Sequence, residues 1–204
     1  MKVKLDKKEL IALCSIGIKR HEAKDKSFRN VCKHGVIEKY THDYIDLYGF
    51  KITKRHLPHI TGVMGEYAYG KLIGEDIDRN IYDVRDDGKD FKNGAEVKCS
   101  TFYSGRWGET ELKIPVREYE DRDPTKYVLT RLSDKILLQS PNSLTVEALG
   151  EISSQKFDMI KGQPKQYTQN GPKNYVVKES DLDPIEAPKK REWTFTEQDE
   201  WYFQ

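Results

Sequence analysis

The residues best suited to chemistry lie in one short segment, 86–100, which is rich in acidic side chains. Asn93-Gly94 within it is typical of a tight turn between two strands, because both residues adopt left-handed backbone conformations easily. After the turn, strand alternation places Glu96 and Lys98 on one face and two apolar side chains on the other. A carboxylate can hold a hard cation, and an ammonium beside it can orient water or offset negative charge. The pair therefore indicates metal-assisted hydrolysis.

The length of the turn decides which aspartate joins this pair. If the turn has two residues, Asp87 shares the face of Glu96 and Lys98. If it has the three residues 92–94, with its glycine in a left-handed bulge, Asp90 lies directly opposite Glu96. Two opposed carboxylates repel each other unless a cation lies between them, which makes the second register a natural metal site. We favour Asp90 and keep Asp87 as the alternative.

This segment resembles the signature of the PD-(D/E)XK nuclease superfamily, which has the restriction-endonuclease-like fold. The signature is an acidic residue on one strand and Asp/Glu-x-Lys on the next, matched here by Asp90 and by Glu96-Val97-Lys98. Many members add a carboxylate on the preceding helix, and Glu66 stands in that place. The resemblance implies that Asp90, Glu96 and Glu66 bind Mg²⁺, or Mn²⁺ in its place. It implies that Lys98 serves the attacking water, and that a mixed sheet flanked by helices carries the site.

The hydrophobic periodicity predicts the elements that position these residues. Helices are expected over 7–20, over 40–50 and from Pro58 to Gly74, and the third would carry Glu66. After residue 80 the period changes to that of strands. The predicted strands cover 81–84, a hairpin across 89–99, 112–116, 127–132, 144–149 and a late edge strand at 175–177, with a short helix over 155–160. This order predicts a mixed α/β fold with a mostly antiparallel sheet.

We divide the chain into three parts. An N-terminal helical, basic part covers 1–56, a nuclease core covers 57–183, and an irregular tail covers 184–204. Residues 1–60 contain 14 Lys and Arg against 7 Asp and Glu, together with all five His. Such an excess suits contact with nucleic-acid phosphates, while a solvated lysine-rich helix surface explains it equally well.

Composition excludes some classes of protein. No apolar run approaches the length of a membrane span, and no signal-peptide pattern follows the basic start, so we expect a cytoplasmic chain without membrane contact. The three cysteines have no CxxC spacing, which is typical of reduced thiols. The spacing of Cys14, His21, Cys32 and His34 fits no common zinc site, and no small-molecule cofactor is expected.

The resemblance, together with these features, predicts a Mg²⁺-dependent deoxyribonuclease. We favour an endonuclease of restriction, phage or repair type and keep a phage recombination exonuclease as an open alternative, with a homodimer as a possible assembly. Ser100 and Thr101, which follow the motif, and Arg106-Trp107 in a glycine-flanked run are possible substrate contacts. The alternative is a non-catalytic nucleic-acid-binding or assembly protein that keeps the fold.

Overall fold

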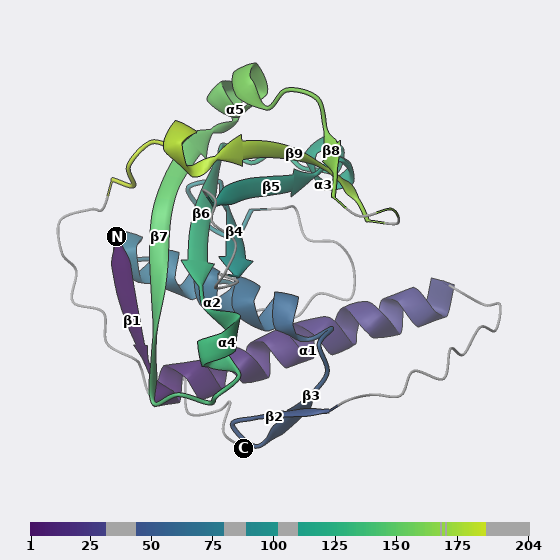
Figure 1. Cartoon of the computed structure of the whole chain (residues 1–204), viewed down its shortest axis with the longest axis vertical. Coiled ribbons are helices and arrows are strands. Elements are labelled where there is room, and N and C mark those ends of the chain that lie inside the picture. Colours follow the sequence, from purple (N-terminus) through teal and green to yellow (C-terminus); the bar gives the residue numbers. More distant parts are fainter. Residues whose placement is uncertain (32–43, 80–88, 102–109, 168, 170, 187–204) are drawn as a thin grey trace.

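The computed structural model describes residues 1–31, 44–79, 89–101, 110–167, 169 and 171–186 (Figure 1). In chain order the elements are β1 (Lys2–Asp6), α1 (Lys7–Val31), β2 (Ile45–Leu47), β3 (Phe50–Ile52), α2 (Leu57–Ile73), β4 (Ala95–Thr101), β5 (Glu111–Pro115), α3 (Val116–Asp121), β6 (Lys126–Leu132), α4 (Asp134–Leu137), β7 (Ser143–Ser153), α5 (Ser154–Ile160), β8 (Lys165–Gln166), β9 (Lys173–Lys178) and the 3-10 helix η1 (Glu179–Asp181). Among these described helices none is long and apolar enough to cross a membrane.

A four-stranded sheet in the order β1-β7-β6-β4 forms the centre of the molecule. β4 runs parallel to β6, whereas β6 with β7 and β7 with β1 are antiparallel. Helices α1 and α2 cover one side, and a smaller sheet in the order β5-β9-β8 lies on the other (Figure 1). The predicted class, a mixed α/β fold with a central mixed sheet flanked by helices, is therefore confirmed.

The side chains of β6 show how the two layers share the central sheet. Val128 packs into the core shared with α1 and α2, while its neighbours Tyr127 and Leu129 pack into a second core under the smaller sheet. All three are almost fully buried. Because successive side chains of a strand point to opposite faces, a continuous apolar run is what a strand covered on both faces requires.

Helix α2 forms where the sequence predicts it. Pro58 stands in the first turn, where its fixed φ suits a helix and its missing N–H costs nothing. Gly74 ends the helix in a left-handed conformation with φ 72°, and its N–H bonds to the carbonyl oxygen of Gly70. The helix is apolar on most sides because it lies between α1 and the sheet.

Some of the predicted secondary structure differs from the structure. The expected helix over 40–50 is, in its described part, the hairpin of β2 and β3, which turns at Tyr48 and Gly49 with φ 53° and 85°. Two successive positive φ angles end any helix there and suit a tight hairpin turn. Strand β1 was not predicted at all. Strand β9 is not an edge strand, because it pairs with both β5 and β8.

Other predicted helices and strands agree with the structure, and some lie outside the described residues. The first helix begins at residue 7 as expected but continues to Val31, well beyond the predicted end at residue 20. The short helix after residue 153 and the strands β5, β6 and β7 lie where they were expected. The expected strand over 81–84 and the tail from residue 187 lie outside the described residues.

Candidate active site

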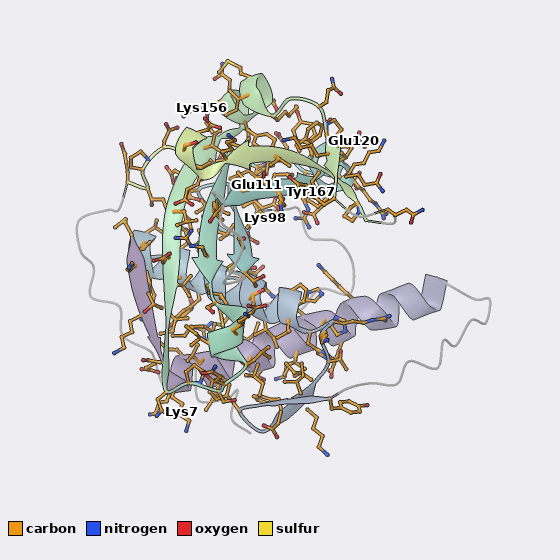
Figure 2. All side chains as sticks on the ribbon, viewed as in Figure 1. Lys7, Lys98, Glu111, Glu120, Lys156 and Tyr167 are labelled. Atoms are coloured by element: carbon orange, nitrogen blue, oxygen red, sulfur yellow. The ribbon has the colours of Figure 1, made fainter. Side chains whose placement is uncertain are left out.

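Strand β4 places two of the predicted site residues side by side. Glu96 and Lys98 stand on one face, as the alternation predicts, and Nζ of Lys98 lies 2.5 Å from Oε1 of Glu96. In the parallel register they neighbour Tyr127 and Leu129 of β6. Figure 2 shows Lys98 between β4 and the smaller sheet. The glutamate is almost completely buried, whereas the lysine side chain keeps part of its surface in solvent.

Asp90 reaches this strand from a turn. The N–H of Gly94, at φ 76°, bonds to the carbonyl oxygen of Phe91, and the N–H of Asp90 bonds to the carbonyl oxygen of Ala95. Four residues therefore separate Asp90 from Ala95, and Asp90 is not the strand partner of Glu96 that the three-residue turn requires. The described residues hold no first strand of the predicted hairpin.

The aspartate is tied to β4 through its side chain instead. Oδ2 of Asp90 accepts the backbone N–H of Val97 at 2.7 Å, which fixes the carboxylate at the start of the strand. Phe91 turns into the core, as expected, and meets the ring of Tyr69 edge-on at 5.2 Å. Asp87 lies outside the described residues, so the choice between the two aspartates stays a prediction.

Glu66 is brought to the site by a close contact between α2 and the sheet. A Cβ on the preceding residue, Gly65, would lie 2.4 Å from Oγ1 of Thr130 and 2.8 Å from Cβ of Cys99. Only glycine allows the helix to lie this close to β4 and β6. The carboxylate of Glu66 is buried and accepts two hydrogen bonds from Nη1 of Arg20, at 2.9 and 2.8 Å.

The pKa of Asp90 reports how close these carboxylates are. Burial raises it well above the ordinary range, and the negative charges of Glu66 and Glu96 raise it further. The hydrogen bond from Val97 and the charge of Lys98 act in the opposite direction without cancelling this. The start of β4 is therefore a place where an additional cation would be favourable.

Glu96 and Lys98 each have a further ion-pair partner, one on helix α3 and one at the residue directly after it. Nζ of Lys98 donates to Oε2 of Glu118 at 2.6 Å, and Nη1 of Arg122 donates to Oε1 of Glu96 at 2.6 Å. Burial lowers the pKa of Lys98, but Glu96 and Glu118 outweigh it and the net shift is upward. The lysine is thus an ammonium ion at neutral pH and acts as a cation and donor, not as a base.

Three residues of this site were missed by the sequence analysis: Arg20, Glu118 and Arg122. The last two are four residues apart on a helical turn, a spacing that supports an ion pair, and they follow a predicted strand. Nothing in the sequence distinguishes Arg20 from the other basic residues of the N-terminal segment.

The structure describes two of the four residues that were predicted to contact the substrate. Ser100 and Thr101 complete β4, beyond Lys98, and pair in register with Arg131 and Leu132. Arg106 and Trp107 lie outside the described residues.

Two of the three predicted metal ligands, Asp90 and Glu96, fit a hard divalent cation. Within the described residues, Oδ1 of Asp90 and Oε2 of Glu96 have no hydrogen bond, so each can offer an oxygen to Mg²⁺ or Mn²⁺. Glu66 is held by Arg20, and no group of three or more His, Cys, Asp or Glu in the described part is arranged around a common point. Mg²⁺ is commonly bound through one or two carboxylates, with water and substrate phosphate completing its shell, so two ligands suffice.

No family model matches the chain, and no curated protein or solved structure is significantly similar to it.

Proposed function

We propose that this chain is a Mg²⁺-dependent nuclease that hydrolyses phosphodiester bonds of DNA as an endonuclease. The observation that supports this most directly is the gathering of Asp90, Glu96 and Lys98 at the start of one strand. Helix α2 adds the carboxylate of Glu66 through the close contact at Gly65. The buried carboxylate of Glu96 and the half-buried one of Asp90 each have an oxygen without a hydrogen bond to the described residues, and with a lysine ammonium they are a fitting set for phosphodiester hydrolysis.

In this proposal a bound Mg²⁺ ion supplies Lewis acidity toward the scissile phosphate and its attacking water. Asp90 and Glu96 would hold the ion through their carboxylates. Lys98 keeps its proton, donates a hydrogen bond toward the reacting groups and offsets the negative charge that builds on the phosphate. Glu118 and Arg122 position Lys98 and Glu96 through the ion pairs described above. They are positioning residues, because they act through those two side chains.

A DNA-cleavage assay with two substrates tests the proposal. Purified protein is incubated with supercoiled and with linear DNA, in Mg²⁺ or in EDTA, and the products are resolved on gels. Nicked or linearised plasmid in Mg²⁺ alone supports an endonuclease, whereas release of mononucleotides from linear ends would make the enzyme an exonuclease. Absence of cleavage in every metal tested would refute the proposal.

We also propose a cytoplasmic location. Cys14 and Cys99 are free thiols, and burial raises the pKa of each to about 12, so both stay protonated and unreactive. Such thiols are typical of a reducing compartment. Detection of the chain in fractionated cells tests this.

A second candidate function is a non-catalytic nucleic-acid-binding or assembly protein. It is favoured by the ion pairs themselves, because Glu96 and Lys98 already have partners in Arg122 and Glu118. In this case the cluster joins β4 to α3 and has no chemical role. Binding of DNA without cleavage in Mg²⁺ or Mn²⁺ would support this candidate over the first.

A further inference from the structure

Helices α1 and α2 approach each other closely where Gly17 faces Ile60. A Cβ on Gly17 would lie 2.6 Å from Cα of Ile60 and 2.8 Å from its backbone nitrogen. One helical turn further along α1 stands His21, which therefore lies beside the residues that open α2. The crossing thus fixes which side chains of the two helices meet.

Three histidine side chains gather at this point. The ring of His21 lies 4.3 Å from that of His56 and 5.1 Å from that of His59, between ring centroids. The backbone N–H of Thr53 lies 3.1 Å from Nδ1 of His56 and donates to it, which holds that ring in place. All three histidine residues are partly exposed.

The surroundings of the three rings are basic. Burial lowers the pKa of His59 to about 4, and the next largest contributions also lower it and come from basic groups: Lys24, His21, Arg20 and His56. Lys24 is exposed on α1, three residues beyond His21. Such a concentration of positive charge around one point favours the binding of an anion there.

This basic cluster borders the candidate active site. Arg20, whose charge reaches His59, pairs with Glu66. Burial raises the pKa of Glu118, but Lys98 and then Arg122 outweigh it, and Lys24 adds a smaller lowering effect. Since Glu118 also bonds to Lys98, the charges of the cluster and of the site act on the same groups.

We propose that His21, His56, His59 and Lys24 form a phosphate-binding surface that seats the backbone of a DNA strand beside the candidate active site. The choice of DNA as ligand rests on the proposed function. Imidazole N–H groups and a lysine ammonium donate to phosphate oxygens, and they can bind successive phosphates without reading a base. None of these four residues belongs to the nuclease signature, so their role is in binding and not in the chemical step.

Binding at this surface is coupled to protons. A phosphate beside His59 counteracts the charges of its basic neighbours and so raises its pKa above the value of about 4 in the free protein. The bound protein then holds more protons than the free protein between those two pKa values, so affinity rises as the pH falls. His59 therefore makes binding several-fold tighter at pH ~5.5 than at pH ~7.5.

Fluorescence anisotropy with a short fluorescein-labelled DNA duplex in EDTA, where the proposed nuclease does not cut, tests the lysine. We expect Lys24→Gln to weaken binding several-fold and to reduce the slope of log Kd against log salt by about one. The matched control is Lys7→Gln, because Lys7 is an exposed lysine at the opposite end of the same helix (Figure 2). Equal affinities and salt slopes for the two variants would overturn the proposal.

The histidine is tested by the pH dependence of the same binding. The affinities of wild-type protein and His59→Gln are compared at about pH 7.5 and about pH 5.5. The other titratable groups are present in both proteins, so the difference between the two pH effects reports on His59. We expect the gain in affinity on acidification to be several-fold larger for the wild type. Identical gains would overturn the proposal, provided that circular dichroism shows both proteins folded.

These outcomes are separable from those of the nuclease assay. A protein that binds DNA through Lys24 and His59 but cuts nothing supports this surface while the proposed nuclease function fails. A protein that cuts DNA, and whose Lys24→Gln and His59→Gln variants bind like the wild type, keeps the nuclease function and loses this surface.

Discussion

Arg20 of α1 donates from a single nitrogen, Nη1, to both carboxylate oxygens of Glu66 on α2, at 2.9 and 2.8 Å. Both side chains are largely buried, with 20% and 10% of their surfaces exposed. Nη2 of the same arginine reaches the carbonyl oxygen of Asp78. One guanidinium therefore joins the N-terminal helix, the helix of the candidate site and the segment that follows it.

Breaking this pair should be costly. We expect Arg20→Gln to lower the free energy of unfolding by about 3 kcal/mol, because it leaves the buried carboxylate of Glu66 without its cation near Asp90. Urea unfolding in EDTA measures the loss. The double variant Arg20→Gln/Glu66→Gln removes the unpaired charge and should recover most of it. A double variant as unstable as the single one would show that the arginine acts by packing alone.

The approach of α2 to β4 depends on Gly65. We expect Gly65→Ala to destabilise the protein by about 1–3 kcal/mol, because its Cβ would collide with Thr130 and Cys99. The matched control is Gly62→Ala on the same helix, where a Cβ meets nothing within 4 Å. That change should stabilise the helix by about 0.5–1 kcal/mol. Thermal unfolding of both variants decides the point, and equal effects would contradict the close contact.

The metal-free stability of the protein should depend on Asp90. Its pKa is raised in the folded state, chiefly by burial and then by Glu66, so the folded protein binds a proton that the unfolded chain releases. Stability contributed by this proton is therefore lost as the pH rises from the ordinary aspartate pKa through the raised one. Asp90→Asn should remove this loss and be as stable as the wild type at neutral pH, or more so.

Urea unfolding in EDTA across this pH range measures the effect. Mg²⁺ should stabilise the wild type at neutral pH and leave Asp90→Asn unchanged, because a ligand that binds only the folded state shifts its stability. A variant that is less stable than the wild type at every pH would mean that the aspartate has a structural role only.

Lys98 should matter for rate more than for binding. We expect Lys98→Ala to lower cleavage by several powers of ten, on the order of losses seen for transition-state contacts, while DNA affinity in EDTA changes far less. Lys113→Ala is the control, since Lys113 also pairs with a neighbouring glutamate but lies on β5. Parallel losses of affinity and rate in Lys98→Ala would reduce the lysine to a phosphate contact.

The sequence predicted the positions of those candidate-site residues that are set by local periodicity. Two-residue alternation alone puts Glu96 and Lys98 on one face, and Pro58 and Gly74 mark the ends of the helix that carries Glu66. The position of Asp90 depends on a four-residue turn whose Phe91 packs on Tyr69 of α2. Such a turn is chosen by tertiary packing, which the Asn93-Gly94 signal does not contain.

The partners of the site residues could not be predicted in this way. Arg20 lies 46 residues from Glu66, and Arg122 lies 26 residues from Glu96. These pairs form only after the helices have docked on the sheet, so local sequence patterns do not report them. The fold class could be predicted without knowledge of these tertiary contacts. The order of helical and strand periods along the sequence already indicates a mixed α/β chain.

The central claim is tested most directly by cleavage of supercoiled DNA in Mg²⁺ and in EDTA, with wild-type protein and Asp90→Asn purified in parallel. The variant controls for contaminating nucleases, because a contaminant would cut equally in both preparations. We predict nicking by the wild type in Mg²⁺, none in EDTA, and none by Asp90→Asn in either. Intact plasmid with wild-type protein in Mg²⁺ and in Mn²⁺, or equal cutting by the variant, would contradict a nuclease site at Asp90, Glu96 and Lys98.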